Sequence, residues 1–101
     1  MSANLLAKVA NGLCDDLLTS VIRAWETDAP HKKKILVAPA MNTYMYVHPV
    51  TAKQLKEISG WRWLEVLMPQ GGKELACGDV GAGAMMEWKE IVENAKKALE
   101  G

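Results

Sequence analysis

Asn42 is the side chain best placed to bind a ligand, because it follows a predicted strand within the segment Pro39–Tyr46. An asparagine amide offers two hydrogen-bond donors and an acceptor without net charge. Ligands of open α/β sheets bind at the carboxyl ends of strands, so Asn42 could hold a substrate carboxylate there. A neutral partner would not over-stabilise a carboxylate that must later leave as carbon dioxide. An Asx-turn or a helix cap is the structural alternative, and the sequence leaves both open.

A glycine-rich loop over residues 69–84 contains one thiol, Cys77, and five of the chain's eight glycines. Its G-x-x-G-x-G spacing differs from the G-x-G-x-x-G of dinucleotide-binding loops. The composition instead fits a mobile lid over a ligand. An unperturbed thiol has a pKa of about 8.5, so near neutral pH Cys77 would be protonated and able to donate a proton. A flexible loop with an incidental cysteine is the alternative.

The segment Ser2–Lys8 begins a predicted helix, where backbone N–H groups lack helical partners and can meet a ligand. The small residues Ser2 and Ala3 would allow close approach. The spacing alone favours an ordinary helix cap by Ser2 or Asn4. Elsewhere, Cys14 is expected to be a buried small apolar residue, and His48 to be structural or exposed.

Composition and charge exclude several classes of protein. Two cysteines and two histidines stand alone along the chain, which argues against a metal site and a disulfide framework. Twelve basic and twelve acidic residues give a net charge of zero, so bulk attraction to nucleic acid or to an anionic membrane is not expected. The longest apolar run covers residues 35–41, far short of the ~20 that span a bilayer. No signal peptide is visible, so the cytosol is the expected compartment.

The elements that must position these residues follow from hydrophobic periodicity. Helices are predicted from about residue 5 to 11, from 16 to 25 with Asp15 or Asp16 as cap, from 49 to 58, and from 86 to 99. On the second helix, the apolar stripe expected to face the core is Leu17, Leu18, Val21, Ile22 and Trp25. Short apolar runs at 34–39 and 63–68 are typical of buried parallel strands.

This order predicts an α/β fold with a parallel sheet. One hundred and one residues allow one domain at most, but two parallel strands make a sheet with almost no interior. The chain is therefore predicted to be part of a doubly wound, three-layer α/β/α domain. Either more sequence precedes Met1, or a partner covers the exposed edge of the sheet.

Three segments together resemble the family of homo-oligomeric flavin-containing cysteine decarboxylases, which includes phosphopantothenoylcysteine decarboxylases and fungal halotolerance flavoproteins. The family pattern Pro-x-Met-Asn-x-x-Met-Trp appears as Pro39–Tyr46, with tyrosine in the last place. The Ser-Ala-Asn-Thr pattern appears as Ser2–Leu5, and the Ala-Cys-Gly-Asp substrate clamp appears as Ala76–Asp79. The resemblance runs from Ser2 to about Val92, and its three segments stand in the family's order.

The resemblance implies a flavodoxin-like fold, a trimeric assembly and FMN held at subunit interfaces. It assigns flavin contacts to Ser2, Ala3, Asn4 and Ala40. It assigns the substrate's carboxylate to Asn42, the substrate clamp to Ala76 and Met85, and proton donation to Cys77.

The implied reaction converts 4′-phosphopantothenoylcysteine to 4′-phosphopantetheine in coenzyme A biosynthesis. FMN would oxidise the substrate's thiol, and the resulting thioaldehyde would absorb the electrons left by carbon dioxide. Reduced flavin would then return a hydride while Cys77 supplies the proton. The flavin carries the redox chemistry, and the protein supplies position and protons.

The sequence departs from the family pattern in one important respect. The family's catalytic histidine and its grip on the FMN phosphate lie before the Ser-Ala-Asn-Thr segment, and neither His31 nor His48 occupies that position. Leu5 also replaces a hydroxyl that could help to bind flavin. Residues 1–101 are therefore expected to be the C-terminal half of a flavoprotein domain. A partner that supplies the histidine, a non-catalytic regulator that inhibits a protein phosphatase, and an inactive fragment all stay open.

Overall fold

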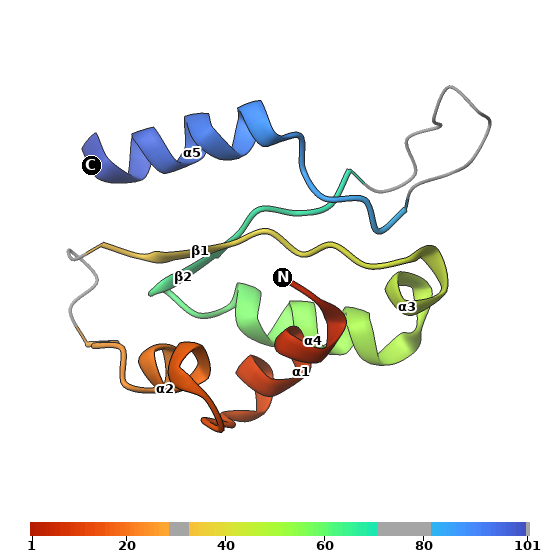
Figure 1. Ribbon diagram of the computed structural model, residues 1–101, viewed down its shortest axis with the longest axis horizontal. Helices are drawn as coiled ribbons and strands as arrows, with labels where there is room; N and C mark the ends of the chain where they lie inside the picture. The colour runs from red at the N-terminus through yellow and green to blue at the C-terminus, as the bar shows by residue number, and fades with distance from the viewer. Residues whose placement is uncertain (29–32, 71–81, 101) are drawn as a thin grey trace.

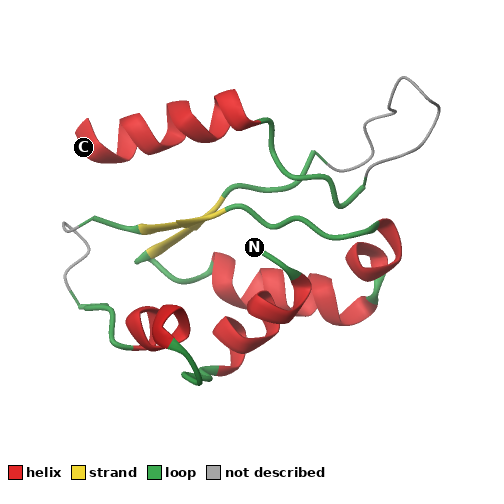
Figure 2. Ribbon diagram, viewed as in Figure 1, coloured by secondary structure: helices red, strands yellow, loops and turns green. Residues whose placement is uncertain are grey.

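The computed structural model describes residues 1–28, 33–70 and 82–100, and within them five helices surround two short strands. The helices are α1 (Ala3–Asn11), α2 (Leu17–Arg23), α3 (Thr43–Val47), α4 (Pro49–Ser59) and α5 (Trp88–Glu100). The strands are β1 (Ile35–Val37) and β2 (Leu64–Val66). Figures 1 and 2 show α1, α2 and α4 on one side of the strands and α5 on the other. This layering confirms the predicted partial three-layer α/β/α arrangement.

The caps of the first two helices explain where they begin and end. The Ser2 hydroxyl oxygen accepts a hydrogen bond from the Leu5 N–H at 3.0 Å, and α1 ends at Gly12 with a left-handed φ of 74°. Asp16 and Thr19 form a capping box at the start of α2. The predicted stop at Gly12 and the predicted cap at Asp16 are therefore confirmed.

The two strands are parallel, with Ile35 opposite Leu64 and Val37 opposite Val66. α4 lies between them in sequence and packs on β2 and α1, as a parallel crossover requires. The core fills the space between these helices and the sheet, and consists of Leu6, Val9, Ile22, Val37, Leu55, Ile58 and Leu64. Both predicted strands form, although each is shorter than its apolar run.

The predicted stripe on α2 is partly wrong. Ile22 is buried as expected, and so is Thr19, whereas Leu17 is 81% exposed and Leu18 is 54% exposed. Thr19 turns inward because its hydroxyl oxygen accepts a hydrogen bond from the Asp16 N–H at 3.1 Å in the capping box. The sheet also ends at β1 within the described residues, so no further strand there covers the other apolar side chains of α2.

Two further expectations need correction. Cys14 is exposed, because it lies in the turn between α1 and α2 and not on the face of either helix. The short helix α3 was not predicted as an element. Tyr44 on this helix is 86% exposed and Met45 is 52% exposed, so α3 lacks the buried stripe that reveals a helix in a sequence.

Candidate functional site

The first link in the candidate site is a pairing between the N-terminal residue and the segment that follows β1. The Met1 amino group donates to the Ala38 carbonyl at 2.6 Å, and the Ala40 N–H donates to the Met1 carbonyl at 2.9 Å. Residue 1 thus pairs with residues 38 and 40 as in a parallel ladder. The start of α1, with Ser2 and Ala3, therefore lies beside the carboxyl end of β1.

The second link joins the far end of the glycine-rich loop to the same place. The Met41 N–H donates to the Gly83 carbonyl at 2.9 Å, and the Gln70 N–H donates to the Ala84 carbonyl at 2.9 Å. The Gln70 side-chain amide also donates to the Met85 carbonyl at 2.9 Å. These bonds fix the position of residues 83–85 next to Asn42.

Gly83 makes this close approach possible. A Cβ at this position would overlap with the Met41 carbonyl oxygen and lie 3.0 Å from the Cβ of Tyr46. Only a residue without a side chain lets the two backbones come this near. The glycine-rich composition of the loop is the sequence signal for such a contact, but it did not identify Gly83 or Gln70 as anchors.

Asn42 is exposed at the N-terminus of α3, where its side-chain oxygen accepts a hydrogen bond from the Met45 N–H at 2.9 Å. The helix-cap alternative for this residue is therefore confirmed. The cap uses only the oxygen of the amide, so the Nδ2 group keeps its two donors. Capping also holds the side chain in one orientation, and a capped Asn42 can still bind a carboxylate through Nδ2.

Ser2, Ala3 and Asn4 occupy the first turn of α1 beside this point. The Ser2 hydroxyl oxygen caps the helix, as the simpler interpretation of this segment predicted. The N–H groups of Ala3 and Asn4 are in the first turn, where a helix offers them no acceptor. Asn4 is exposed and Ala3 is half-buried, so these donors border the same surface as Ala40.

The site is electrically neutral apart from the Met1 amino group. Residues 1–4, 38–42 and 82–85 contain no Asp, Glu, Lys, Arg or His. The charges near α1 gather at its opposite end, where Lys8 and Asp15 form an ion pair at 2.8 Å. That hydrogen bond raises the pKa of Lys8 and lowers the pKa of Asp15, while bonds from Thr19 lower the pKa of Asp16.

The remaining predicted site residues divide into three groups. Ala40 and Met85 lie at the site, and Met85 is 44% exposed. Ala76 and Cys77 lie outside the described residues, as does His31, so their predicted roles stay predictions. His48 is exposed and caps α4 by accepting the Val50 N–H on Nδ1 at 3.1 Å, which confirms a structural position for it.

No group of three or more His, Cys, Asp or Glu side chains within residues 1–28, 33–70 and 82–100 could hold a metal ion. In the same ranges, no helix has both the length and the apolar character needed to cross a membrane.

Comparison with known proteins identifies relatives along the whole chain. A family model described as Flavoprotein matches residues 1–100. The mouse phosphopantothenoylcysteine decarboxylase is 46% identical over 98% of this chain and 46% of its own length. Coenzyme A biosynthesis protein 3 of Saccharomyces cerevisiae is 47% identical over 98% of this chain and 17% of its own length.

Solved structures show the same fold. A PPC decarboxylase mutant complexed with pantothenoylaminoethenethiol superposes with a TM-score of 0.81 at 40% identity, covering 100% of this chain and 52% of that one. The FMN binding protein AtHal3 gives a TM-score of 0.81 at 42% identity, covering 99% of this chain and 51% of that one. The chain therefore spans about half the length of these structures, and half or less of these sequence relatives.

Proposed function

The chain belongs to the Flavoprotein family, and from this premise we propose that it is the C-terminal half of a phosphopantothenoylcysteine decarboxylase-like protein that uses FMN. The observation that carries the proposal is the meeting of three separate segments at the carboxyl end of β1. Met1 pairs with Ala38 and Ala40, and Gly83 pairs with Met41. Two of these segments, those around Ser2 and Asn42, carry patterns of the family, and the third contains Met85.

The donors at this site fit part of a flavin mononucleotide. The first-turn N–H groups of α1 and the amides of Asn4 and Asn42 are neutral donors, which suit the carbonyl and nitrogen atoms of a flavin ring. The same segments offer no lysine, arginine or histidine for the phosphate. The residues therefore fit the ring of the cofactor, and the phosphate must be held by residues outside these three segments.

The roles of the chain's own residues follow from this placement. When bound, FMN supplies the oxidation of the substrate's thiol and the later return of a hydride. Asn42 orients the substrate's carboxylate through Nδ2 while its oxygen stays on the Met45 N–H. Its neutrality leaves the departing carboxylate without a cation to retain it. Cys77 donates the final proton, a role that rests on the resemblance alone.

The activity of the whole protein requires a histidine and a phosphate grip that this half does not supply. The solved relatives are about twice as long as this chain, and the free edge of β1 lies next to Met1. We therefore propose that the chain acts in a homo- or hetero-trimer, in which the N-terminal half of the domain, in the same protein or in a partner, completes the site, and that it works in the cytosol. Its substrate is 4′-phosphopantothenoylcysteine.

A complementation assay tests this proposal with the full chain. A full-length phosphopantothenoylcysteine decarboxylase whose own counterparts of Asn42 and Cys77 are replaced retains the histidine but should be inactive. Adding this chain should restore turnover of phosphopantothenoylcysteine, because each chain then supplies what the other lacks. Native mass spectrometry of the mixture reports whether mixed trimers form. Mixed trimers without any turnover would refute the catalytic assignment.

Variants of this chain separate capping from substrate binding. Asn42→Asp keeps the cap of α3 but places a carboxylate against the substrate's carboxylate, so recovered turnover should fall at least tenfold through raised KM. Asn94→Asp is the matched control, because Asn94 lies on α5 and bonds to the Glu90 carbonyl. Cys77→Ser should still release carbon dioxide but should not yield the reduced product. Equal turnover with both asparagine variants would contradict the role of Asn42.

A further inference from the structure

A second cavity lies at the opposite end of the sheet from the candidate site. It has a volume of about 340 Å³ and lies between the end of α1, α2 and the residues that precede β2. Trp63 precedes the first residue of β2, so the cavity is at the amino end of the strands, whereas Asn42 follows the carboxyl end. A volume above about 300 Å³ is in the range of small-molecule sites.

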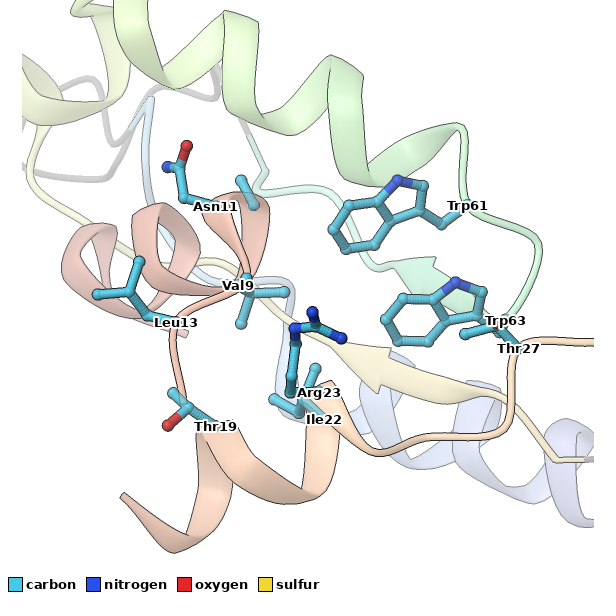
Figure 3. A pocket seen from close by; sticks show the side chains of 11 residues that line it. Val9, Asn11, Leu13, Thr19, Ile22, Arg23, Thr27, Trp61 and Trp63 are labelled. Carbon is cyan, nitrogen blue, oxygen red and sulfur yellow. The ribbon is translucent and has the colours of Figure 1, made fainter. Parts of the chain in front are cut away.

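Two stacked indole rings form one wall of this cavity. The rings of Trp61 and Trp63 are 5.0 Å apart between centroids and 14° from parallel. Figure 3 shows both rings on the same side of the cavity, with the Arg23 guanidinium reaching toward Trp63. Both tryptophans are half-buried and pack against the hydrophobic core, so part of each ring stays exposed at the cavity.

Arg23 is the one charged side chain among the described residues that line the cavity. It forms no ion pair or hydrogen bond within the described ranges 1–28, 33–70 and 82–100. Its stem packs over Gly12, where an added Cβ would lie 3.5 Å from the Arg23 Nε. The guanidinium is therefore positioned at the cavity and its donors are available.

Two other polar side chains of the lining, those of Asn11 and Thr19, already have hydrogen-bond partners. The Asn11 amide nitrogen donates to the Ala7 carbonyl at 2.7 Å, and the Thr19 hydroxyl bonds to Asp16 at 2.8 Å. Asp15, the other acid before α2, pairs with Lys8. Neither Glu26 nor Asp28, which flank Thr27 in the sequence, is among the described residues that line the cavity, so Arg23 is the charged side chain there.

From the stacked rings and the uncommitted guanidinium, we propose that this cavity binds a small planar aromatic carboxylate. The ring of the ligand stacks on the indole wall, and its carboxylate accepts paired hydrogen bonds from Arg23. Because Arg23 brings one positive charge to the cavity, a ligand with one carboxylate balances it. The site is separate from the flavin-family site and does not depend on the proposed function.

The test titrates 2-naphthoate into the full ¹⁵N-labelled chain and follows the four tryptophan indole N–H signals by NMR. The Trp61 and Trp63 signals should shift saturably, while those of Trp25 and Trp88 serve as internal references. Arg23→Gln should weaken binding about tenfold to a hundredfold. Arg62→Gln is the matched control, because Arg62 is exposed and outside the lining, and it should bind as the unmodified chain does.

Two further probes separate the parts of the proposal. 2-Naphthylmethanol has the ring without the charge, and cyclohexanecarboxylate has the charge without the aromatic face, so each should bind more weakly than 2-naphthoate. Absence of saturable shifts with 2-naphthoate overturns the site. Equal weakening by the two arginine variants, or equal affinity for all three probes, overturns the assigned chemistry.

Discussion

Replacing Gly83 with alanine should destabilise the contact that joins the glycine-rich loop to the segment of Asn42. The new Cβ would overlap with the Met41 carbonyl oxygen and lie 3.1 Å from the carbonyl carbon, so one backbone must move. Neither moves freely, because the Met41 N–H is bonded to the Gly83 carbonyl at 2.9 Å. Overpacking costs about 1–3 kcal/mol and a lost hydrogen bond about 1 kcal/mol, so we expect a loss of about 2–4 kcal/mol.

Urea unfolding followed by tryptophan fluorescence measures this loss. With an m-value of about 1–3 kcal/mol/M, the midpoint should fall by roughly 0.7–4 M. Gly60→Ala is the matched control, because Gly60 has a right-handed helical conformation and an added Cβ would lie 3.5 Å from the nearest atom, the Glu57 carbonyl oxygen. That substitution should be neutral or stabilise by about 0.4–1 kcal/mol. If Gly83→Ala unfolds at the same urea concentration as Gly60→Ala, the close backbone approach is refuted.

Substitutions at three further positions test the elements that support the site. Ser2→Ala should lower the free energy of unfolding by about 1 kcal/mol through loss of the α1 cap, and Ser2→Asp should recover it in the same urea assay; a neutral Ser2→Ala would contradict the cap. Bonds from Thr19 lower the pKa of Asp16 in the folded chain. The ionised Asp16 therefore adds to the free energy of unfolding above the unfolded pKa of about 4, and this addition is lost as the pH falls through the lower pKa of the folded chain. The urea midpoint of the chain should therefore fall relative to that of Asp16→Asn below about pH 4, and parallel acid profiles would count against this linkage. Ile58 is fully buried, so thermal unfolding should report a loss of about 2–5 kcal/mol for Ile58→Ala and about 0.5–1.5 kcal/mol for Ile58→Val, and equal losses would be inconsistent with a packed core position.

The fold could be predicted where local chemistry and burial agree. Gly12, Asp16 and Gly60 each mark a helix boundary through a cap or a terminal turn that depends on a few neighbouring residues. Prediction of burial failed where the residue type suggested a core position but the backbone places the side chain outside the packed helix faces. Cys14 is apolar enough to be buried, but it falls in a turn outside the packed faces of α1 and α2.

The candidate site could be predicted residue by residue but not as an arrangement. Asn42 follows a strand, and that local fact was visible in the sequence. The bond between Met1 and Ala38 joins residues 37 positions apart, and no pattern of residue types specifies such a pairing. The close approach of Gly83 to Met41 likewise became visible only when both backbones were placed.

The error on α2 supports the expectation that the sheet is incomplete. Leu18 and Val21 are exposed, yet both line an apolar groove that also contains Leu36 of β1 and the N-terminal Met1. Exposed apolar side chains are ordinary when they are scattered, but these share one groove along the free edge of β1. Met1 already pairs with residues 38 and 40 in parallel register at that edge. The predicted stripe is therefore wrong for Leu17, Leu18 and Val21 in the described structure, and the apolar character of Leu18 and Val21 suits a wider sheet than β1 and β2 provide.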